Sequence, residues 1–301
     1  MMVSVDAFGV KKQIFEDMLH DYDDAKQWLE NIGIKIESGR FQSYKKLIEQ
    51  SLQKGKFYSP DVNDTDALWA IAELNDLLEI SNFLRDIELG DIKGTLNWLK
   101  KGAPLLSSEP KDGGGIHGRN FTFELYASSR FLRAGLDVSY QSDADLNILI
   151  ANTLLHVECK RAVTENNLEG LIEKAIEQID RSCEENHNDR GLIVLSLSKL
   201  FWKIQMGLNQ GNVADENELQ SLLHPVSEQI AREIRARYAT KSENVLGLVF
   251  HYKVPFYRHS NGFPAFINRF SFVSFSEPGT KNKAISDVLS THLNQSVYGC
   301  G

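Results

Sequence analysis

The chain has 301 residues, of which 42% are hydrophobic, 25% charged and 10% aromatic, and its formal net charge is −8. This composition is that of a globular protein with a sizeable core, and it argues against a protein that coats nucleic acid through bulk positive charge. No stretch reaches the roughly 18 consecutive apolar residues that span a membrane, and the first residues lack the apolar core of a signal peptide. The sparse cysteines show no paired spacing, so we expect neither disulfides nor a zinc site, and we expect a cytoplasmic protein with no membrane association.

The first part of the chain, residues 1–106, is predicted to be a helical domain. Apolar residues recur at spacings of three and four from Ile14 to Leu29, and residues 65–87 carry a long apolar stripe. The following segment, residues 107–118 (SSEPKDGGGIHG), is rich in glycine and serine and has no periodicity. We therefore interpret it as a linker.

The pattern changes in the remaining part, residues 119–301. Its first elements are predicted to be a helix, three strands, a second helix and a fourth strand, over residues 120–134, 136–140, 145–151, 154–160, 167–182 and 192–197. A further helix and two strands are expected over residues 225–239, 245–251 and 270–275. This order predicts an α/β fold, with a mixed central sheet flanked by helices and an all-helical region before it.

One group of residues in this part has the chemistry of a metal site. Glu158 and Lys160 point to the same face of their strand, because side chains alternate along a strand. A hairpin centred on Asn152 would place Asp145 level with them, and Glu124 on the preceding helix can add a third carboxylate. Mg²⁺ prefers carboxylate oxygens, waters and phosphate oxygens, so this spacing predicts a Mg²⁺ site, in which Mn²⁺ would substitute.

The context of this group distinguishes it from similar strings elsewhere in the chain. An acidic residue, any residue and then lysine occur four times, beginning at Asp24, Asp91, Glu109 and Glu158. Only the last of these closes an apolar strand that follows an alternating strand and precedes an amphipathic helix. Asp143 has the same strand parity as Asp145 and is an alternative, but the alternating run begins directly after Asp145.

These residues resemble the PD-(D/E)XK nuclease superfamily, which has the restriction-endonuclease-like fold. The resemblance covers residues 120–197 and is strongest in the segments FELYASSRFLRAG, SDADLNILI and HVECKRA. It departs from the family pattern at Ala144, which stands where the motif has its proline. The resemblance implies catalytic roles for Asp145, Glu158, Lys160, Glu124 and Gln178. It implies metal ligation by Asp145, Glu158, Glu124 and the backbone carbonyl of Cys159.

The function that the resemblance implies is a Mg²⁺-dependent nuclease, with DNA favoured over RNA and a restriction or phage-defence context. The helical region, residues 1–106, would then regulate cleavage, select substrate, or bind a partner protein or a second copy of the chain. Two alternatives stay open at this point. The same fold can serve as a catalytically inactive nucleic-acid-binding or assembly module, or as an effector nuclease that acts only with a trigger or partner.

Basic residues outside this group are candidate contacts to a nucleic-acid backbone. They are Arg130, Arg161, Arg232 and Arg235. For each of them, a solvated charged surface is the interpretation that we favour.

Overall fold

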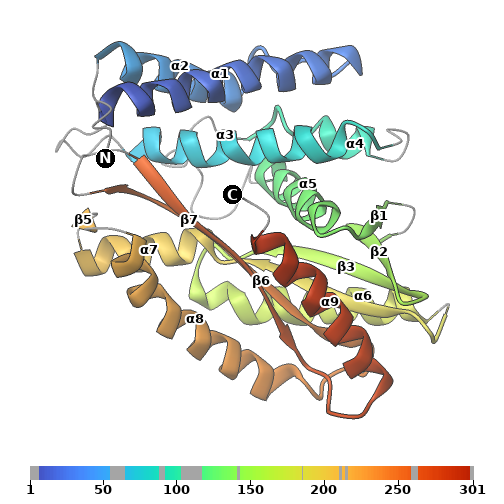
Figure 1. Cartoon of the computed structure of the whole chain (residues 1–301). Coiled ribbons are helices and arrows are strands. Elements are labelled where there is room, and N and C mark those ends of the chain that lie inside the picture. Colours follow the sequence, from blue (N-terminus) through green and yellow to red (C-terminus); the bar gives the residue numbers. More distant parts are fainter. Residues whose placement is uncertain are drawn as a thin grey trace, which may run out of the picture.

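Figure 1 shows layers of helices over a twisted sheet, with further helices on the other side of the sheet. The computed structural model describes residues 7–54, 65–87, 92–102, 117–140, 143–184, 186–209, 212–213, 216–258 and 264–298. Within these ranges the predicted fold class is confirmed, because helices surround a mixed sheet and a helical region precedes it. The finer assignment to a restriction-endonuclease-like core stays a prediction.

The N-terminal region consists of helices, as predicted. They are α1 (Ala7–Asn31), α2 (Arg40–Lys54), α3 (Thr65–Leu84) and the single turn α4 (Lys93–Leu96). α3 is apolar on nearly every side, and consecutive residues from Ala67 to Leu78 are mostly buried. A helix of this kind is stable only where neighbours cover it all round, and α3 lies between the outer helices and the sheet (Figure 1). None of the described helices, α3 included, has the length and hydropathy needed to cross a membrane.

The segment with the candidate site residues has the predicted order of elements. In chain order these are α5 (His117–Arg133), β1 (Asp137–Ser139), β2 (Leu146–Ile150), β3 (Thr153–Arg161), α6 (Leu168–Cys183) and β4 (Arg190–Ser196). Gly135 follows α5 with a φ of +73°, a left-handed conformation that glycine adopts without steric strain. Ala151 and Asn152 also have positive φ angles, 48° and 60°, as a tight two-residue hairpin requires. The strands predicted over residues 145–151 and 154–160 leave a turn at Asn152 and Thr153. The observed turn therefore lies one residue earlier.

The described strands form one mixed sheet in the order β1-β2-β3-β4-β6-β5, where β5 spans Asn212–Val213 and β6 spans Val245–Arg258. β7 (Pro264–Ser274) pairs with β6. β1 to β3 are antiparallel neighbours, whereas β4 and β6 run parallel to β3. Parallel neighbours need a crossover, which α6 supplies between β3 and β4. Arg161 and Ser196, at the carboxyl ends of β3 and β4, consequently lie in register with His251 in the middle of β6.

The remaining described helices are α7 (Ser198–Asn209), α8 (Glu216–Tyr238) and α9 (Lys281–Tyr298). The sequence predicts a helix from Pro225, but α8 begins nine residues earlier and passes through this proline. The predicted start is wrong because Leu219 and Leu223 are fully buried and hold the first turns of α8 on the core. Proline removes one helical hydrogen bond, and this packing compensates for its loss.

The N-terminal helices share a hydrophobic cluster with the sheet. Leu29, Leu74, Phe131 and Val157 belong to the same buried cluster, so α1 and α3 pack through α5 onto β3. A second cluster, under α6 and α8, covers the opposite face of the sheet. Of the predicted linker, His117 and Gly118 belong to α5, and the rest lies outside the described residues. The division into domains 1–106 and 119–301 stays a prediction.

Candidate active site

The predicted acidic residues meet where β2 begins and β3 ends. Leu146 pairs with Val157 in the antiparallel register, so the preceding residue, Asp145, lies opposite Glu158. The tight turn between the strands sets this register, and a slip of one residue would direct the β3 side chains to the wrong face. We call Glu124, Asp145, Glu158 and Lys160 the carboxylate cluster.

Lys160 lies between two of the carboxylates. Its Nζ is 2.6 Å from Glu158 Oε2 and 3.7 Å from Asp145 Oδ2. Asp145 Oδ2 also accepts a hydrogen bond of 2.7 Å from the backbone N–H of Cys159. The Glu158 side chain is 1% exposed and that of Asp145 is 24% exposed. Solvent therefore reaches the cluster at Asp145 and not at Glu158.

The cluster contains more negative charge than Lys160 neutralises. Burial, followed by the charge of Asp145, raises the pKa of Glu158 to about 7, although Lys160 opposes the shift. Burial and then Asp145 also raise the pKa of Glu124, a buried residue of α5, so Glu124 faces the same group. Burial by itself would lower the pKa of Lys160, but Asp145 and Glu158 outweigh it and raise that pKa. An additional cation would therefore stabilise the cluster.

The donor atoms of the cluster fit a hard divalent cation, but Lys160 keeps them apart. Glu124, Asp145 and Glu158 offer the carboxylate oxygens that Mg²⁺ and Mn²⁺ prefer. Their oxygens do not all lie within 4.8 Å of one another; among the described residues, that condition is met on the exposed surface of α1 by His20, Asp21 and Asp24. Lys160 Nζ already occupies Glu158 Oε2, so a cation can be coordinated through this oxygen only if Lys160 Nζ leaves it.

Cys159 offers its backbone carbonyl to this edge and not its thiol. The thiol is buried in the core cluster, and burial raises its pKa well above the usual value, so it stays protonated. The N–H of Cys159 points to Asp145 beyond the start of β2. The N–H and C=O of one strand residue point to the same side, so the carbonyl is directed to the edge where Asp145 lies.

The predicted site residue Gln178 lies on α6, the helix that follows β3. It is half-buried on α6, and its Oε1 is buried without a hydrogen-bond partner. One turn earlier on α6, Lys174 lies close enough to Glu158 to lower its pKa. Sequence reasoning missed Lys174, although its four-residue spacing from Gln178 places both on one side of the helix. The role of Gln178 stays a prediction.

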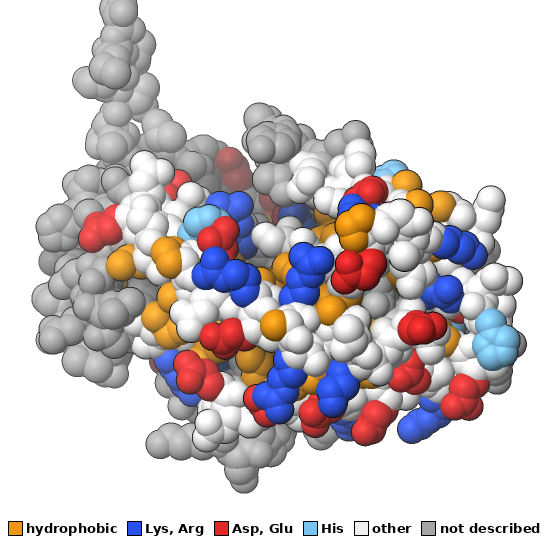
Figure 2. Space-filling model, turned by 90° about the horizontal axis from the view of Figure 1, so that it is seen from below, with side chains coloured by type: hydrophobic (Ala, Val, Ile, Leu, Met, Phe, Trp, Pro, Cys, Tyr) orange, Lys and Arg blue, Asp and Glu red, His pale blue; other side chains and the backbone are white. Residues whose placement is uncertain are grey.

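The candidate nucleic-acid contacts occupy three different environments. Arg130 is 9% exposed, and its Nη1 lies 3.8 Å from Glu79 Oε2 of α3, so it is buried within the protein. Arg161 donates a hydrogen bond of 3.3 Å to Asn120 Oδ1 of α5 and lines a cavity beside the cluster. Arg232 and Arg235 are exposed on α8. Figure 2 shows basic and acidic side chains interspersed on the face seen from below, which is the pattern of a solvated surface.

Two other residues singled out by their chemistry have structural roles. His156 is buried beside the cluster, with Nδ1 2.9 Å from Asn147 Oδ1 and Nε2 3.3 Å from Asp189 Oδ2. His251 stacks on Phe123, and burial lowers its pKa well below the usual value, so it is neutral. These contacts are packing and hydrogen bonding within the fold.

Comparison of the chain with protein-family models, with curated proteins and with solved structures finds no match. The functional argument consequently depends on the residues of the site and on their geometry. Four of the predicted site residues, Glu124, Asp145, Glu158 and Lys160, come together from α5, β2 and β3.

Proposed function

We propose that this protein is a metal-dependent nuclease that hydrolyses phosphodiester bonds on a restriction-endonuclease-like core. The observation that carries the proposal is the convergence of Asp145, Glu158 and Lys160 at neighbouring strand ends, with Glu124 facing them from α5. The order of elements from α5 to β4 supports the same assignment. The preference for DNA over RNA, the cytoplasmic location and a role in restriction or phage defence follow from the sequence resemblance alone.

The residues of the cluster have separate tasks in this proposal. A bound Mg²⁺ supplies a water of lowered pKa and neutralises charge on the phosphate. Asp145, Glu158, Glu124 and the carbonyl of Cys159 hold the cation, which requires deprotonated carboxylates. The raised pKa of Lys160 favours its charged form, so we assign it to stabilising the charge on the phosphate oxygens and not to proton abstraction.

A second candidate is an effector nuclease that is silent until a trigger or partner binds. One observation favours it: the Lys160 ammonium lies 2.6 Å from Glu158 Oε2, where it competes with a metal ion for that oxygen. A trigger that moves α5 or β3 would release Lys160 from this contact. The N-terminal helices pack on α5, so they are placed to transmit such a change.

Cleavage of a panel of substrates tests the proposal. Single- and double-stranded DNA and RNA, linear and circular, are incubated with the full chain and Mg²⁺ or Mn²⁺. We expect cleavage by the wild type and its loss in Lys160→Ala. The matched control is Lys26→Ala, because Asp24-Ala25-Lys26 has the same sequence pattern but lies on the exposed helix α1. Cleavage that survives unchanged in Asp145→Ala, Glu158→Ala and Lys160→Ala would overturn the assignment of a nuclease centre to this cluster.

Metal binding separates an inactive module from a nuclease that needs a trigger. Calorimetric titration with Mn²⁺ is performed on the wild type and on Asp145→Ala without any substrate. A nuclease awaiting a trigger binds Mn²⁺ at the cluster, and Asp145→Ala binds it more weakly. Equal binding by the two proteins would remove the metal site and the proposed function with it.

A further inference from the structure

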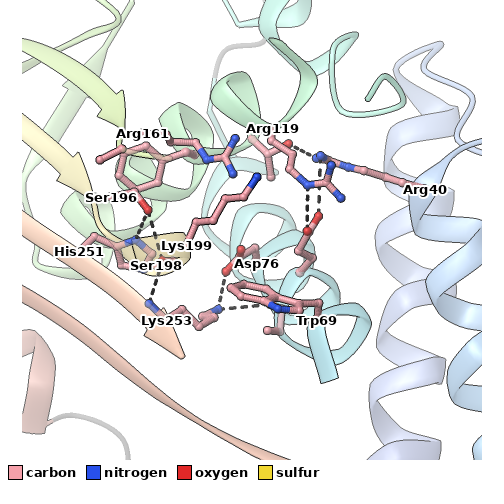
Figure 3. Close-up of a pocket in the computed structure, with 15 residues that line it drawn as sticks. Arg40, Trp69, Asp76, Arg119, Arg161, Ser196, Ser198, Lys199, His251 and Lys253 are labelled. Atoms are coloured by element: carbon pink, nitrogen blue, oxygen red, sulfur yellow. Dashed lines mark hydrogen bonds and ion pairs between the residues drawn. The ribbon is translucent and has the colours of Figure 1, made fainter. Parts of the chain in front are cut away.

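A second buried site lies beside the carboxylate cluster, in a cavity of about 60 Å³. It is bounded by the carboxyl ends of β3 and β4, by the middle of β6 and by residues of α2, α3, α5 and α7. Figure 3 shows Arg161 and Lys199 reaching into it from one side, while Arg119 and Arg40 approach from the other. We call this site the basic cavity.

Positive charge predominates among the described residues that line the basic cavity. Five cationic side chains face two carboxylates there: Arg40, Arg119, Arg161, Lys199 and Lys253 against Glu73 and Asp76. The whole chain has a net charge of −8, so this excess is a local feature of the fold. An excess of buried positive charge favours the binding of an anion.

The two carboxylates are already used by neighbouring donors. Glu73 Oε2 accepts a hydrogen bond of 2.8 Å from Tyr44 Oη, and Glu73 Oε1 accepts one of 3.0 Å from Arg119 Nε. Burial would raise the pKa of Glu73, but Arg119 and Arg40 outweigh it and hold that pKa below the usual value. Asp76 pairs with Lys253 Nζ. Both carboxylates are therefore already engaged by donors of the protein itself.

Arg40 provides the clearest evidence for a ligand. It is 1% exposed, and its Nη2 donates to Thr122 Oγ1, yet Nε and Nη1 have no hydrogen-bond partner. The carboxylate oxygen Glu73 Oε2 lies 3.7 Å from Nη1, beyond hydrogen-bond distance. The indole N–H of Trp69, which is 8% exposed and also lines the cavity, has no partner either. Buried donors of this kind are rare in folded proteins and call for an acceptor.

We propose that the basic cavity binds a phosphate group. Its volume is that of roughly four to five waters, which is comparable with the five heavy atoms of a phosphate. Guanidinium groups match phosphate oxygens in geometry and charge, and the ammonium of Lys199 at the half-buried rim adds a further donor. The proposal rests on the donors of the cavity and does not require nuclease activity.

Two sources can supply such a group: inorganic phosphate in solution, or the terminal phosphate of a nucleic acid. Arg161 directly follows Lys160 in β3, and its partner Asn120 lies one turn before Glu124 on α5. A phosphate in the basic cavity would therefore lie at the same end of β3 as the carboxylate cluster, where Lys160 and Arg161, as consecutive strand residues, point to opposite faces of the sheet.

Binding of inorganic phosphate to the full chain tests the proposal, with EDTA present so that no cleavage occurs. We expect phosphate to raise the thermal midpoint of the wild type and to bind in calorimetry. Lys199→Ala should weaken the affinity by about tenfold or more, because a hydrogen bond to a charged group contributes roughly 1.5–3 kcal/mol. The matched control is Lys203→Ala, one turn later on α7, whose Nζ donates to Val163 O outside the cavity and whose affinity should be unchanged.

Arg40→Met provides a second, independent variant. It replaces a buried guanidinium that lacks two hydrogen bonds by an apolar side chain of similar length, so we expect the fold to be retained and phosphate binding to be lost. If this variant does not fold, Lys199→Ala still decides the test because its side chain is at the rim. The proposal is overturned if phosphate has no effect on the wild type, or if Lys199→Ala binds phosphate as tightly as Lys203→Ala.

The source of the phosphate is resolved with a short single-stranded oligonucleotide that carries either a 5′-phosphate or a 5′-hydroxyl group. Tighter binding of the phosphorylated form, lost in Lys199→Ala, identifies a nucleic-acid end as the ligand. Equal binding of the two forms, together with binding of inorganic phosphate, identifies a small anion. Either outcome supports a phosphate site, and both are measured without divalent ions, so they are independent of cleavage.

Discussion

Lys160 and Arg161, two consecutive residues of β3, belong to two regions whose charge imbalances have opposite sign. Lys160 belongs to the carboxylate cluster, in which its ammonium pairs with Asp145 and Glu158 and in which Glu124 adds a third carboxylate nearby. Arg161 belongs to the basic cavity, in which cationic side chains outnumber carboxylates. Both regions are buried, where uncompensated charge is unfavourable. The two proposals accordingly assign each region a ligand of opposite sign, a cation in the cluster and a phosphate in the cavity.

The two regions also differ in how they are built. Asp145 and Glu158 are joined by one hairpin, so short segments of the chain supply most of the carboxylate cluster. The basic cavity draws Arg40 from α2, Trp69 from α3 and Lys199 from α7, which are far apart in sequence. The N-terminal helices therefore contribute directly to the lining of the cavity, and under the phosphate proposal they would bind ligand as well as pack.

The largest expected effect separates the functions of the two regions. Asp145→Asn should reduce single-turnover cleavage by about 10³-fold or more, which corresponds to roughly 4 kcal/mol, because it removes a carboxylate ligand and its charge. The same variant should bind phosphate as the wild type does, since Asp145 does not line the basic cavity. Kinetics and calorimetry on one protein preparation check both statements. Loss of phosphate binding in Asp145→Asn would show that the regions are not independent.

The next largest effect is expected at Glu73, whose carboxylate pairs with Arg40 and Arg119 in the basic cavity. Glu73→Gln should destabilise the fold by about 3 kcal/mol, because it leaves Arg40 and Arg119 buried without their carboxylate. Glu49→Gln on α2 is a matched control, since Glu49 is exposed and should change stability by about 0.5 kcal/mol or less. Urea denaturation measures both variants. Inorganic phosphate should make the loss in Glu73→Gln smaller, and a loss that phosphate does not reduce would argue against the phosphate site.

A smaller effect is expected from the pH dependence of the carboxylate cluster. The pKa of Glu158 is raised from 4.5 to about 7 in the folded protein. Its contribution to stability is therefore complete below pH 4.5 and is lost as the pH rises through about 7. Glu158→Gln should remove this loss and stabilise the protein at pH 8 in EDTA by on the order of 1 kcal/mol.

Denaturation of both proteins at pH 5 and pH 8 measures the difference. Mn²⁺ should reverse the sign of the stability difference between the two proteins at pH 8, because the ionised Glu158 binds the metal and glutamine binds it more weakly. The metal affinity of the wild type should also rise from pH 5 to pH 8. A wild type that gains more stability than Glu158→Gln between pH 5 and pH 8 without metal would contradict the charge imbalance of the cluster.

The smallest effect is expected at the exposed arginines of α8. Arg232→Ala and Arg235→Ala should each weaken binding of nucleic acid by about twofold to threefold at low salt, and each should reduce the salt slope by about 1. The comparison is with Lys199→Ala at the cavity rim, where the donor is half-buried and less screened. Fluorescence anisotropy at several salt concentrations gives both quantities. Equal losses at α8 and at the rim would mean that the basic cavity is no more than an ordinary charged surface.

The elements around the carboxylate cluster could be predicted because their signals are local. The alternation of Leu146, Ile148 and Ile150 predicts a half-buried strand, and all three are buried as expected. The apolar positions of the helix after β3, Ile172 to Ile179, are buried as their spacing predicts. Period and parity depend on residues within a few positions of one another, so the sequence alone is sufficient to read them.

Other features depend on contacts that no local pattern reports. Pro225 lies inside α8 because the turns before it are held by the core, and α7 and α9 are absent from the elements predicted from the sequence. Arg130 looks like a surface contact in the sequence, but packing against α3 buries it. In each case tertiary packing outweighs the local preference of the chain.

By itself, the sequence determined the order of elements from α5 to β4 and the grouping of Asp145, Glu158 and Lys160 on adjoining strands. Only the tertiary structure decided that Glu124 faces this group and that Lys160 separates its carboxylates. It also created the basic cavity, in which Arg40 meets Thr122 across 82 residues and Lys253 meets Asp76 across 177. Strand pairing across a tight turn follows from neighbouring residues, whereas a buried charge finds its partners only after distant segments have packed together.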